Sequence, residues 1–182
     1  PVLMYHSVED QAIPGNGGVV SSAKFESDMK TLKEAGYEGI FFQDLENYLR
    51  GRGTLPKKPI MIIFDDGYEN NYTHAFPIAK AYGMKFTVSI VGWSINIRSY
   101  PSIPEYRSHF GFEEMKRMRE SKLVDFQNHT YDLHSKNGLS QFGLIPVGKG
   151  VLPMAEEKPE AYKHRLSADL SKLNRLVRKE LG

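Results

Sequence analysis

Short apolar runs alternate along the chain with longer stretches in which apolar residues recur every three or four positions. Short runs predict strands, and periodic stretches predict amphipathic helices. Several runs are apolar at nearly every position, which is typical of parallel strands covered on both faces. The alternation therefore predicts a parallel α/β domain. The expected strands are Val2–Tyr5, Gly39–Phe42, Ile60–Phe64, Phe86–Val91 and Leu123–Phe126.

Helices are expected between and after these strands. The clearest is Pro159–Leu181, which opens with a proline in its first turn and carries apolar residues along one face. Tyr72–Tyr82 contains Pro77, which should kink the helix or mark a late start. Gly51–Pro59 and Ser135–Pro153 are rich in Gly, Pro, Lys and Ser, and predict loops. Further helical segments are expected at Ala23–Ala35, Leu45–Leu49 and Phe112–Arg119.

The composition is that of an ordinary globular protein of 182 residues, with 40% hydrophobic residues, 25% charged residues and a formal net charge of +2. A chain of this length can bury a sizeable core as one domain. Its basic residues are scattered, so we expect no nucleic-acid partner, because phosphate binding needs clustered Lys and Arg. No apolar run has the length of a membrane span. Cysteine is absent, which excludes disulfides and thiolate zinc sites.

Two adjacent carboxylates, Asp65 and Asp66, follow the apolar run Ile60–Phe64 and precede Gly67. Functional groups gather at the carboxyl ends of strands in barrels and open α/β sheets. Neighbours on an extended chain point to opposite sides, so the two carboxylates need not do the same job. Gly67 allows a sharp change of direction that keeps both near one centre. Taken alone, the triplet is more typical of a turn or a helix cap.

Two imidazoles, His129 and His134, follow another expected strand and should lie at the same edge. Their spacing places them on different faces of a regular helix, so a shared metal requires a loop or an irregular turn. Taken alone, they could be surface histidines. One carboxylate with two imidazoles, however, is a ligand set suited to zinc or a similar divalent ion, with water completing the shell. The other carboxylate is then free to act as a base on that water.

These residues carry a family resemblance. Ile63-Phe-Asp-Asp-Gly-Tyr68 resembles the first signature of the polysaccharide deacetylases, the NodB-homology group or carbohydrate esterase family 4. Asn128-His-Thr-Tyr-Asp-Leu-His134 resembles their second signature, and the opening Val2–Val8 and Ala35-Gly-Tyr37 resemble the start of such domains. The histidines are one residue further apart than in the commonest family pattern, which resembles the branch that acts on poly-N-acetylglucosamine.

The resemblance implies Asp65 as the general base and Asp66, His129 and His134 as metal ligands. It implies a divalent metal, zinc first, with cobalt or nickel as alternatives. The implied enzyme is a hydrolase of carbon–nitrogen bonds that removes N-acetyl groups from a cell-surface or cell-wall polysaccharide, with metal-bound water as the nucleophile. The expected partner is a polysaccharide or oligosaccharide, and the expected location is extracellular or at a bacterial cell surface.

The implied fold is a distorted (β/α) barrel, incomplete in this chain. The family's later signatures are not found before Gly182, and five expected strands do not comfortably close a barrel of this type. We therefore expect residues 1–182 to form a single catalytic domain that corresponds to the N-terminal and central part of a polysaccharide deacetylase domain. Its C-terminal strands and later motifs would be absent.

Aromatic residues and one further histidine are candidates for substrate contacts. His6 follows the first expected strand, so a substrate contact or acid role competes with a structural hydrogen bond. Tyr68 adjoins the carboxylates. Trp93, with Tyr100 and Tyr106 nearby, could stack on sugar rings or simply pack a loop. The remaining histidines are treated as surface residues: His74, His109 and His164.

Two rival functions stay open. A deacylase with the same scaffold could act on a small cyclic or linear amide, in which case a closed pocket is expected instead of a long open groove. A carbohydrate-binding relative could have lost catalysis. The presence of Asp65 argues against a pure binder, which needs no base, whereas the missing later signatures argue for it.

Overall fold

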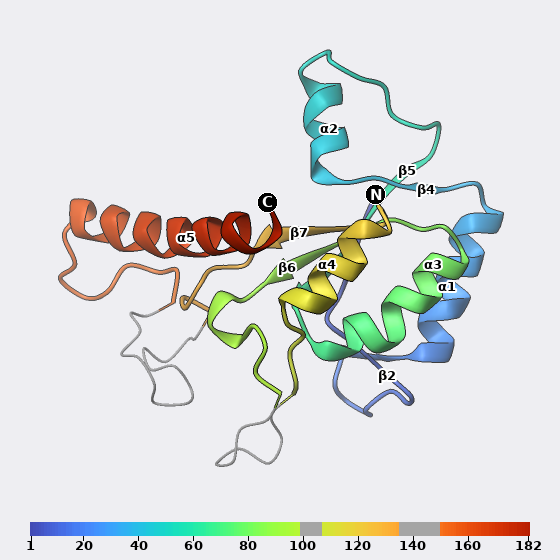
Figure 1. The fold of residues 1–182 in the computed structure, drawn as a ribbon, viewed down its shortest axis with the longest axis horizontal. Coiled ribbons are helices and arrows are strands. Elements are labelled where there is room, and N and C mark those ends of the chain that lie inside the picture. The colour runs from blue at the N-terminus through green and yellow to red at the C-terminus, as the bar shows by residue number, and fades with distance from the viewer. Residues whose placement is uncertain (99–106, 135–149) are drawn as a thin grey trace. The chain divides into compact units, whose positions relative to one another are not determined.

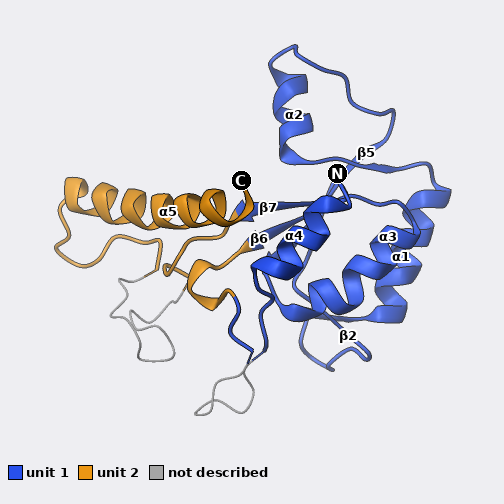
Figure 2. Cartoon of the chain, viewed as in Figure 1, with its two compact units in different colours: residues 1–89, 96–127 blue, residues 90–95, 128–182 orange. Residues whose placement is uncertain are grey.

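The computed structural model describes residues 1–98, 107–134 and 150–182. Tyr100, Tyr106 and most of the predicted loop Ser135–Pro153 lie outside these described residues. The chain forms two compact units, residues 1–89 with 96–127 and residues 90–95 with 128–182 (Figure 2). Two of the boundaries between the units fall one residue before the end of a strand. Ile90 and Asn128, the last residues of the strands Phe86–Ile90 and Val124–Asn128, therefore belong to the second unit.

The main element is a five-stranded sheet with the order β1–β5–β6–β7, in which β4 also pairs with the start of β5 (Figure 1). β1 and β4 run parallel to β5. Together with the helices that follow its strands, this sheet confirms the predicted parallel α/β fold. Among the described residues β1 and β7 are the two end strands of the order and do not pair with each other, which is consistent with part of a barrel. The strands are β1 Val2–Tyr5, β4 Glu38–Gly39, β5 Pro59–Asp66, β6 Phe86–Ile90 and β7 Val124–Asn128.

Five predicted strands are therefore present, but the second is much shorter than expected. The prediction of a strand over Gly39–Phe42 is wrong beyond Gly39. The strand β4 ends at Gly39, and α2 (Phe42–Leu49) begins at Phe42. The Asp44 carboxylate accepts the Phe41 N–H at 2.9 Å, which caps the first turn of the helix. A separate parallel pair, β2 (Ser7–Glu9) and β3 (Val19–Ser21), was not predicted, because three residues are too few to show a strand periodicity.

The helices follow the predicted pattern. The expected helix over Tyr72–Tyr82 is divided into a π turn, Asn71–Ala75, and α3, whose first turn contains Pro77. A proline in the first turn costs no hydrogen bond there, so the late start has a clear cause. The long C-terminal helix has the predicted bounds. The remaining helical elements are α1 Ser22–Glu34, α3 Phe76–Ala81, the 3-10 turn Gly92–Ser94, α4 Phe112–Glu120 and α5 Pro159–Leu181.

Four aromatic rings form the centre of the first unit. Phe64 on β5 contacts Tyr5, Phe25 and Phe86, with ring centroids 5.2–5.4 Å apart. Three of these rings, all except Tyr5, are fully buried. Aromatic pairs at such distances stabilise a core beyond the effect of their buried area. This cluster fixes β5, and with it the carboxylates at the end of β5.

No helix in the described part of the chain combines the length and the apolar character that a membrane crossing requires. The longest, α5, carries charged residues along most of its length and has Leu173 as its buried residue.

Candidate metal centre

Asp65 and Asp66 are the last two residues of β5. Asp65 retains the conformation of the strand, but Asp66 has a φ of 74° and Gly67 a φ of 82°. A left-handed conformation is uncommon for a residue other than glycine, and such backbone is found at functional sites more often than elsewhere. The chain thus turns at Asp66 itself, one residue earlier than the glycine predicted. Asp66 is 7% exposed.

His129 follows β7 directly, and its backbone N–H donates to the carbonyl of Ile90 at the end of β6, at 3.0 Å. The next residue, Thr130, has a φ of 73°, so the chain leaves the strand direction at once. His134 lies at the far end of the turn that follows. The two imidazole rings lie 5.1 Å apart between centroids. The irregular turn that the spacing of these histidines requires is therefore present.

Every backbone N–H from His129 to Leu133 has an acceptor. The Thr130 N–H donates to the Asn128 side chain at 2.7 Å, and the Leu133 N–H donates to the Thr130 hydroxyl at 3.2 Å. The amides of Tyr131 and Asp132 donate to the two carboxylate oxygens of Asp169, at 2.7 and 2.8 Å. Asp169 lies on α5, far along the sequence, so this helix takes part in shaping the turn.

Burial and neighbouring charged groups shift the pKa of Asp132, a residue of this turn that is 7% exposed. Burial raises the pKa of the Asp132 carboxyl, and the nearby Asp169 carboxylate raises it further, whereas the Lys172 ammonium lowers it. The Lys172 ammonium also lies 3.6 Å from the centre of the Tyr131 ring. The turn thus carries a compact group of charges from α5 and from its own residues.

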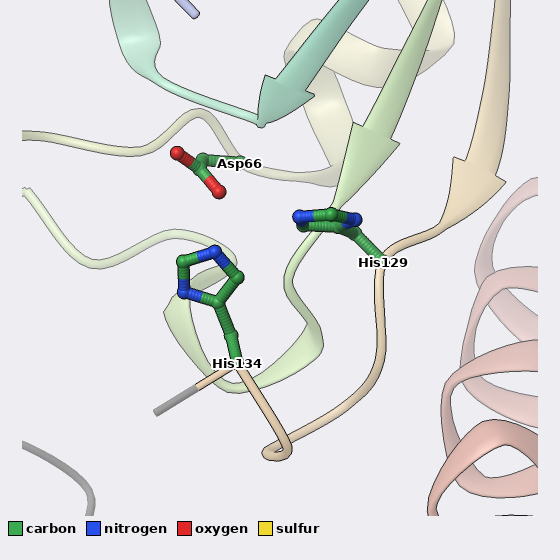
Figure 3. A group of neighbouring side chains, drawn as sticks. All are labelled: Asp66, His129 and His134. Atoms are coloured by element: carbon green, nitrogen blue, oxygen red, sulfur yellow. The ribbon is translucent and has the colours of Figure 1, made fainter. Parts of the chain in front are cut away.

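Asp66, His129 and His134 each offer a ligand atom, and these three atoms lie within 4.8 Å of one another (Figure 3). Two atoms that each bind one zinc ion at ~2.1 Å are at most ~4.2 Å apart, so small side-chain rotations suffice to bring all three into range. A carboxylate with two imidazoles is a donor set that zinc and similar divalent ions accept. The residues present fit the metal that the sequence predicts. Figure 3 shows these three side chains.

The other predicted site residues lie near different partners. His6 lies 3.9 Å from Asp65, measured between Nε2 and Oδ2, and the Asp65 side chain is 15% exposed. Tyr68 pairs with His109 through an isolated antiparallel bridge and contacts its ring at 4.9 Å between centroids. Trp93 lies in the 3-10 turn Gly92–Ser94, and its backbone N–H donates to the carbonyl of Tyr131 at 2.9 Å. Their roles remain predictions.

One prediction about the histidines is wrong. His109 was expected on the surface, but it is 7% exposed, because its segment pairs with Tyr68 and its N–H donates to the carbonyl of Ile97. His164 is exposed, as expected. Asp169 is not predicted from the sequence, since nothing in the periodicity of α5 marks a carboxylate that accepts hydrogen bonds from the backbone amides of a distant turn.

The sequence matches a known protein family. The family model for polysaccharide deacetylase matches residues 52–179, which is well over half of the sequence. The chain belongs to the polysaccharide deacetylase family. The residue resemblance in the two signatures is thereby confirmed at the level of the family.

Among curated relatives of this polysaccharide deacetylase chain, YxkH of Bacillus subtilis (strain 168), whose name assigns it to the same family, is 34% identical over 140 residues, covering 77% of this chain and 45% of the relative. The poly-beta-1,6-N-acetyl-D-glucosamine N-deacetylase of Escherichia coli (strain K12) is 25% identical over 187 residues, covering 97% of this chain and 28% of the relative. This chain thus spans less than half the length of either relative.

A solved structure has the same fold. The structure of a de-N-acetylase from Aggregatibacter actinomycetemcomitans matches with a TM-score of 0.81 and 25% sequence identity, over 100% of this chain and 74% of that one. The predicted fold class, that of the NodB-type deacetylases, is confirmed.

Proposed function

We propose that this polysaccharide deacetylase chain is a metal-dependent hydrolase that removes N-acetyl groups from an extracellular polysaccharide built of N-acetylglucosamine. The single observation that carries the proposal is the group of Asp66, His129 and His134, whose ligand atoms lie within 4.8 Å of one another. Family membership supports the reaction, and the name of the Escherichia coli relative supports the glycan. We further propose that residues 1–182 act as one catalytic domain at the cell surface or in the cell wall.

In this proposal Asp66, His129 and His134 hold one divalent cation, most simply zinc. When bound, such a cation supplies Lewis acidity, which makes a water molecule acidic near neutral pH and polarises an amide carbonyl. The proposed ligand set leaves room for that chemistry, because three protein ligands do not fill a four-coordinate shell.

Asp65 would accept the proton of the attacking water. It is adjacent to Asp66 and its side chain is mostly buried, so it can remain close to the reaction while its neighbour binds the cation. As the oxygen of water bonds to the acetamide carbon, the proton passes to Asp65 and the carbon–nitrogen bond then breaks. Acetate leaves, and the nitrogen of the sugar takes a proton to become a free amine.

His6, Tyr68 and Trp93 are proposed to contact the substrate. The position of His6, 3.9 Å from the carboxylate of Asp65, supports a role beside the proposed base, either as a substrate contact or as the acid that gives the amine its proton. Tyr68 directly follows Gly67 at the end of the same signature, and Trp93 adjoins the turn that carries the histidines through its bond to Tyr131.

The test is acetate release by the purified protein, loaded with zinc, from oligomers of β-1,6-linked N-acetylglucosamine. Parallel assays use β-1,4-linked oligomers and a small N-acetylated amide. The account predicts release from the β-1,6 oligomers, and a decrease of ~10²–10⁴-fold in Asp65→Asn. Asp10→Asn is the matched control, because Asp10 is 93% exposed in its side chain and should not matter. Turnover of the small amide alone would support the small-molecule rival, and glycan binding without acetate release would support the inactive binder.

A further inference from the structure

We propose that Asp169 is a positioning residue of the metal centre, which sets the shape of the turn that presents His129 and His134. The inference rests on the proposed function, since it concerns the same cation. It deepens that proposal by assigning a role to a carboxylate of α5 that lies outside both signature motifs.

The conformation of the turn from His129 to His134 depends on contacts from outside the turn. Thr130 is β-branched and has a φ of 73°, a conformation that such residues adopt only when neighbouring contacts impose it. The local side chains supply two of the hydrogen bonds, from Asn128 and from the Thr130 hydroxyl. The two amides in the middle of the turn have no local acceptor, and both donate to Asp169.

The two hydrogen bonds to Asp169 are charge-assisted, and such bonds are stronger than those between neutral groups. Both oxygens of one carboxylate accept neighbouring backbone amides, at 2.7 Å from Tyr131 and 2.8 Å from Asp132. A charged acceptor with two donors fixes orientation as well as distance. Because the amides belong to the residues between the histidines, any shift of this anchor alters the direction in which both imidazoles point.

Three further contacts join the same stretch of α5 to this segment. The Asn128 side chain donates to the carbonyl of Leu170 at 2.9 Å and to Asn174 at 2.8 Å. The ammonium of Lys172 lies over the Tyr131 ring. Asp169 is therefore the first of four α5 residues, from Asp169 to Asn174, that contact the chain from Asn128 to Asp132. It acts on the cation through the histidines and does not itself touch the reacting atoms.

The test is the binding of Co²⁺ to the full chain, measured by calorimetry and by the visible d–d absorption, which reports the coordination geometry. Asp169→Asn keeps the size of the side chain but turns one acceptor into a donor that faces a backbone N–H. We expect the variant to fold and to bind Co²⁺ roughly 10–100-fold more weakly, with an altered absorption spectrum. Glu160→Gln, on the same helix with an 85% exposed side chain, is the control and should match the wild type.

The outcomes separate the two proposals. If the wild type binds one Co²⁺ that His134→Ala cannot bind, and Asp169→Asn has the affinity and spectrum of the wild type, Asp169 has no positioning role although the metal site stands. If the wild type binds no Co²⁺, the proposed function and this inference fail together. Should Asp169→Asn not fold, Asp169→Glu decides. It keeps the charge, moves the carboxylate by one methylene, and is expected to fold with weaker binding and a shifted spectrum. Wild-type affinity in that variant would overturn the inference.

Discussion

Gly92 lies so close to Tyr131 that a Cβ on residue 92 would stand 2.5 Å from the Tyr131 Cδ2 and 3.0 Å from its Cα. The Gly92 N–H also donates to the carbonyl of Thr130 at 3.0 Å. The segment after β6 therefore approaches the histidine turn at backbone distance, which only a residue without a side chain permits.

Gly92→Ala should therefore displace Tyr131 and loosen the turn between the two histidines. We expect a loss of about 1–3 kcal/mol in the free energy of unfolding, as for other overpacked sites, together with weaker Zn²⁺ binding. Urea unfolding and zinc titration measure the two effects. Gly53→Ala is the matched control, because a Cβ there meets only Asn47, at an ordinary 3.6 Å. Equal stability of the two variants would contradict the close approach.

Removal of the metal should destabilise the folded chain as well as stop turnover. A ligand that binds only the native state stabilises it by about 2.7 kcal/mol at a hundred times its dissociation constant. We expect a chelator to lower the unfolding temperature, and added Zn²⁺ to restore it. His129→Ala should show no such dependence on Zn²⁺. A zinc effect of the same size in that variant would mean that the stabilising ion binds elsewhere.

The aromatic cluster beneath the carboxylates predicts a large effect for Phe25. Its ring is fully buried and contacts Tyr5 and Phe64 at 5.1 and 5.4 Å between centroids. Phe25→Ala should lower the free energy of unfolding by about 3–5 kcal/mol, the range for a buried phenylalanine. Phe42→Ala, at a residue that is 41% exposed, should lower the free energy of unfolding much less. Denaturant titration of both variants gives the comparison, and similar losses would count against this core.

The pH dependence of stability should reveal the ion pair of Glu157 and Arg165. The two groups form a double contact, at 2.8 Å through each carboxylate oxygen. The Arg165 hydrogen bonds, joined by the Met154 amide, lower the pKa of Glu157 from 4.5 to about 2. A lowered folded-state pKa means that the stabilising contribution is complete above pH 4.5 and is lost as the pH falls toward 2.

Unfolding temperatures of the wild type and Glu157→Gln, measured from pH 7 to pH 2, test this relation. The difference should be constant from pH 7 to about 5 and should shrink steadily below that. Glu160→Gln serves as the control, since the side chain of Glu160 is 85% exposed. A difference that grew on acidification would have the wrong sign for a lowered pKa.

Periodicity predicted most of the fold because β5 and β6 bury most of their side chains on both faces, which leaves a clear apolar run in the sequence. Five strands and the helix Pro159–Leu181 were expected from apolar runs alone, and the helix has the predicted bounds. The errors fall where a side-chain contact decides a boundary, as where the Asp44 carboxylate starts α2 early. Such a contact depends on geometry that a hydrophobic pattern does not contain.

Parallel strands bring their carboxyl ends to one edge, so the sequence predicts that the carboxylate pair lies near His129 and His134. The choice of Asp66 over Asp65 as the ligand comes from the family resemblance. The role of Asp169 could not be predicted, because the sequence of a mostly exposed helix does not indicate which backbone amides one of its carboxylates will bind. His109 shows the same limit, because its burial depends on a pairing with Tyr68 that no sequence pattern indicates. What the sequence predicts is thus the proposed ligands, and what it omits is the set of contacts around them.

The central claim is that Asp66, and not Asp65, binds the cation together with His129 and His134. Metal content after dialysis, measured for Asp65→Asn and Asp66→Asn, tests it with the same chemical change at neighbouring positions. Asparagine tolerates the left-handed backbone at residue 66, so the second variant should fold. The account predicts one zinc ion per chain in the wild type and in Asp65→Asn, and none in Asp66→Asn. Retention of zinc in Asp66→Asn, or its loss in folded Asp65→Asn, would contradict the account.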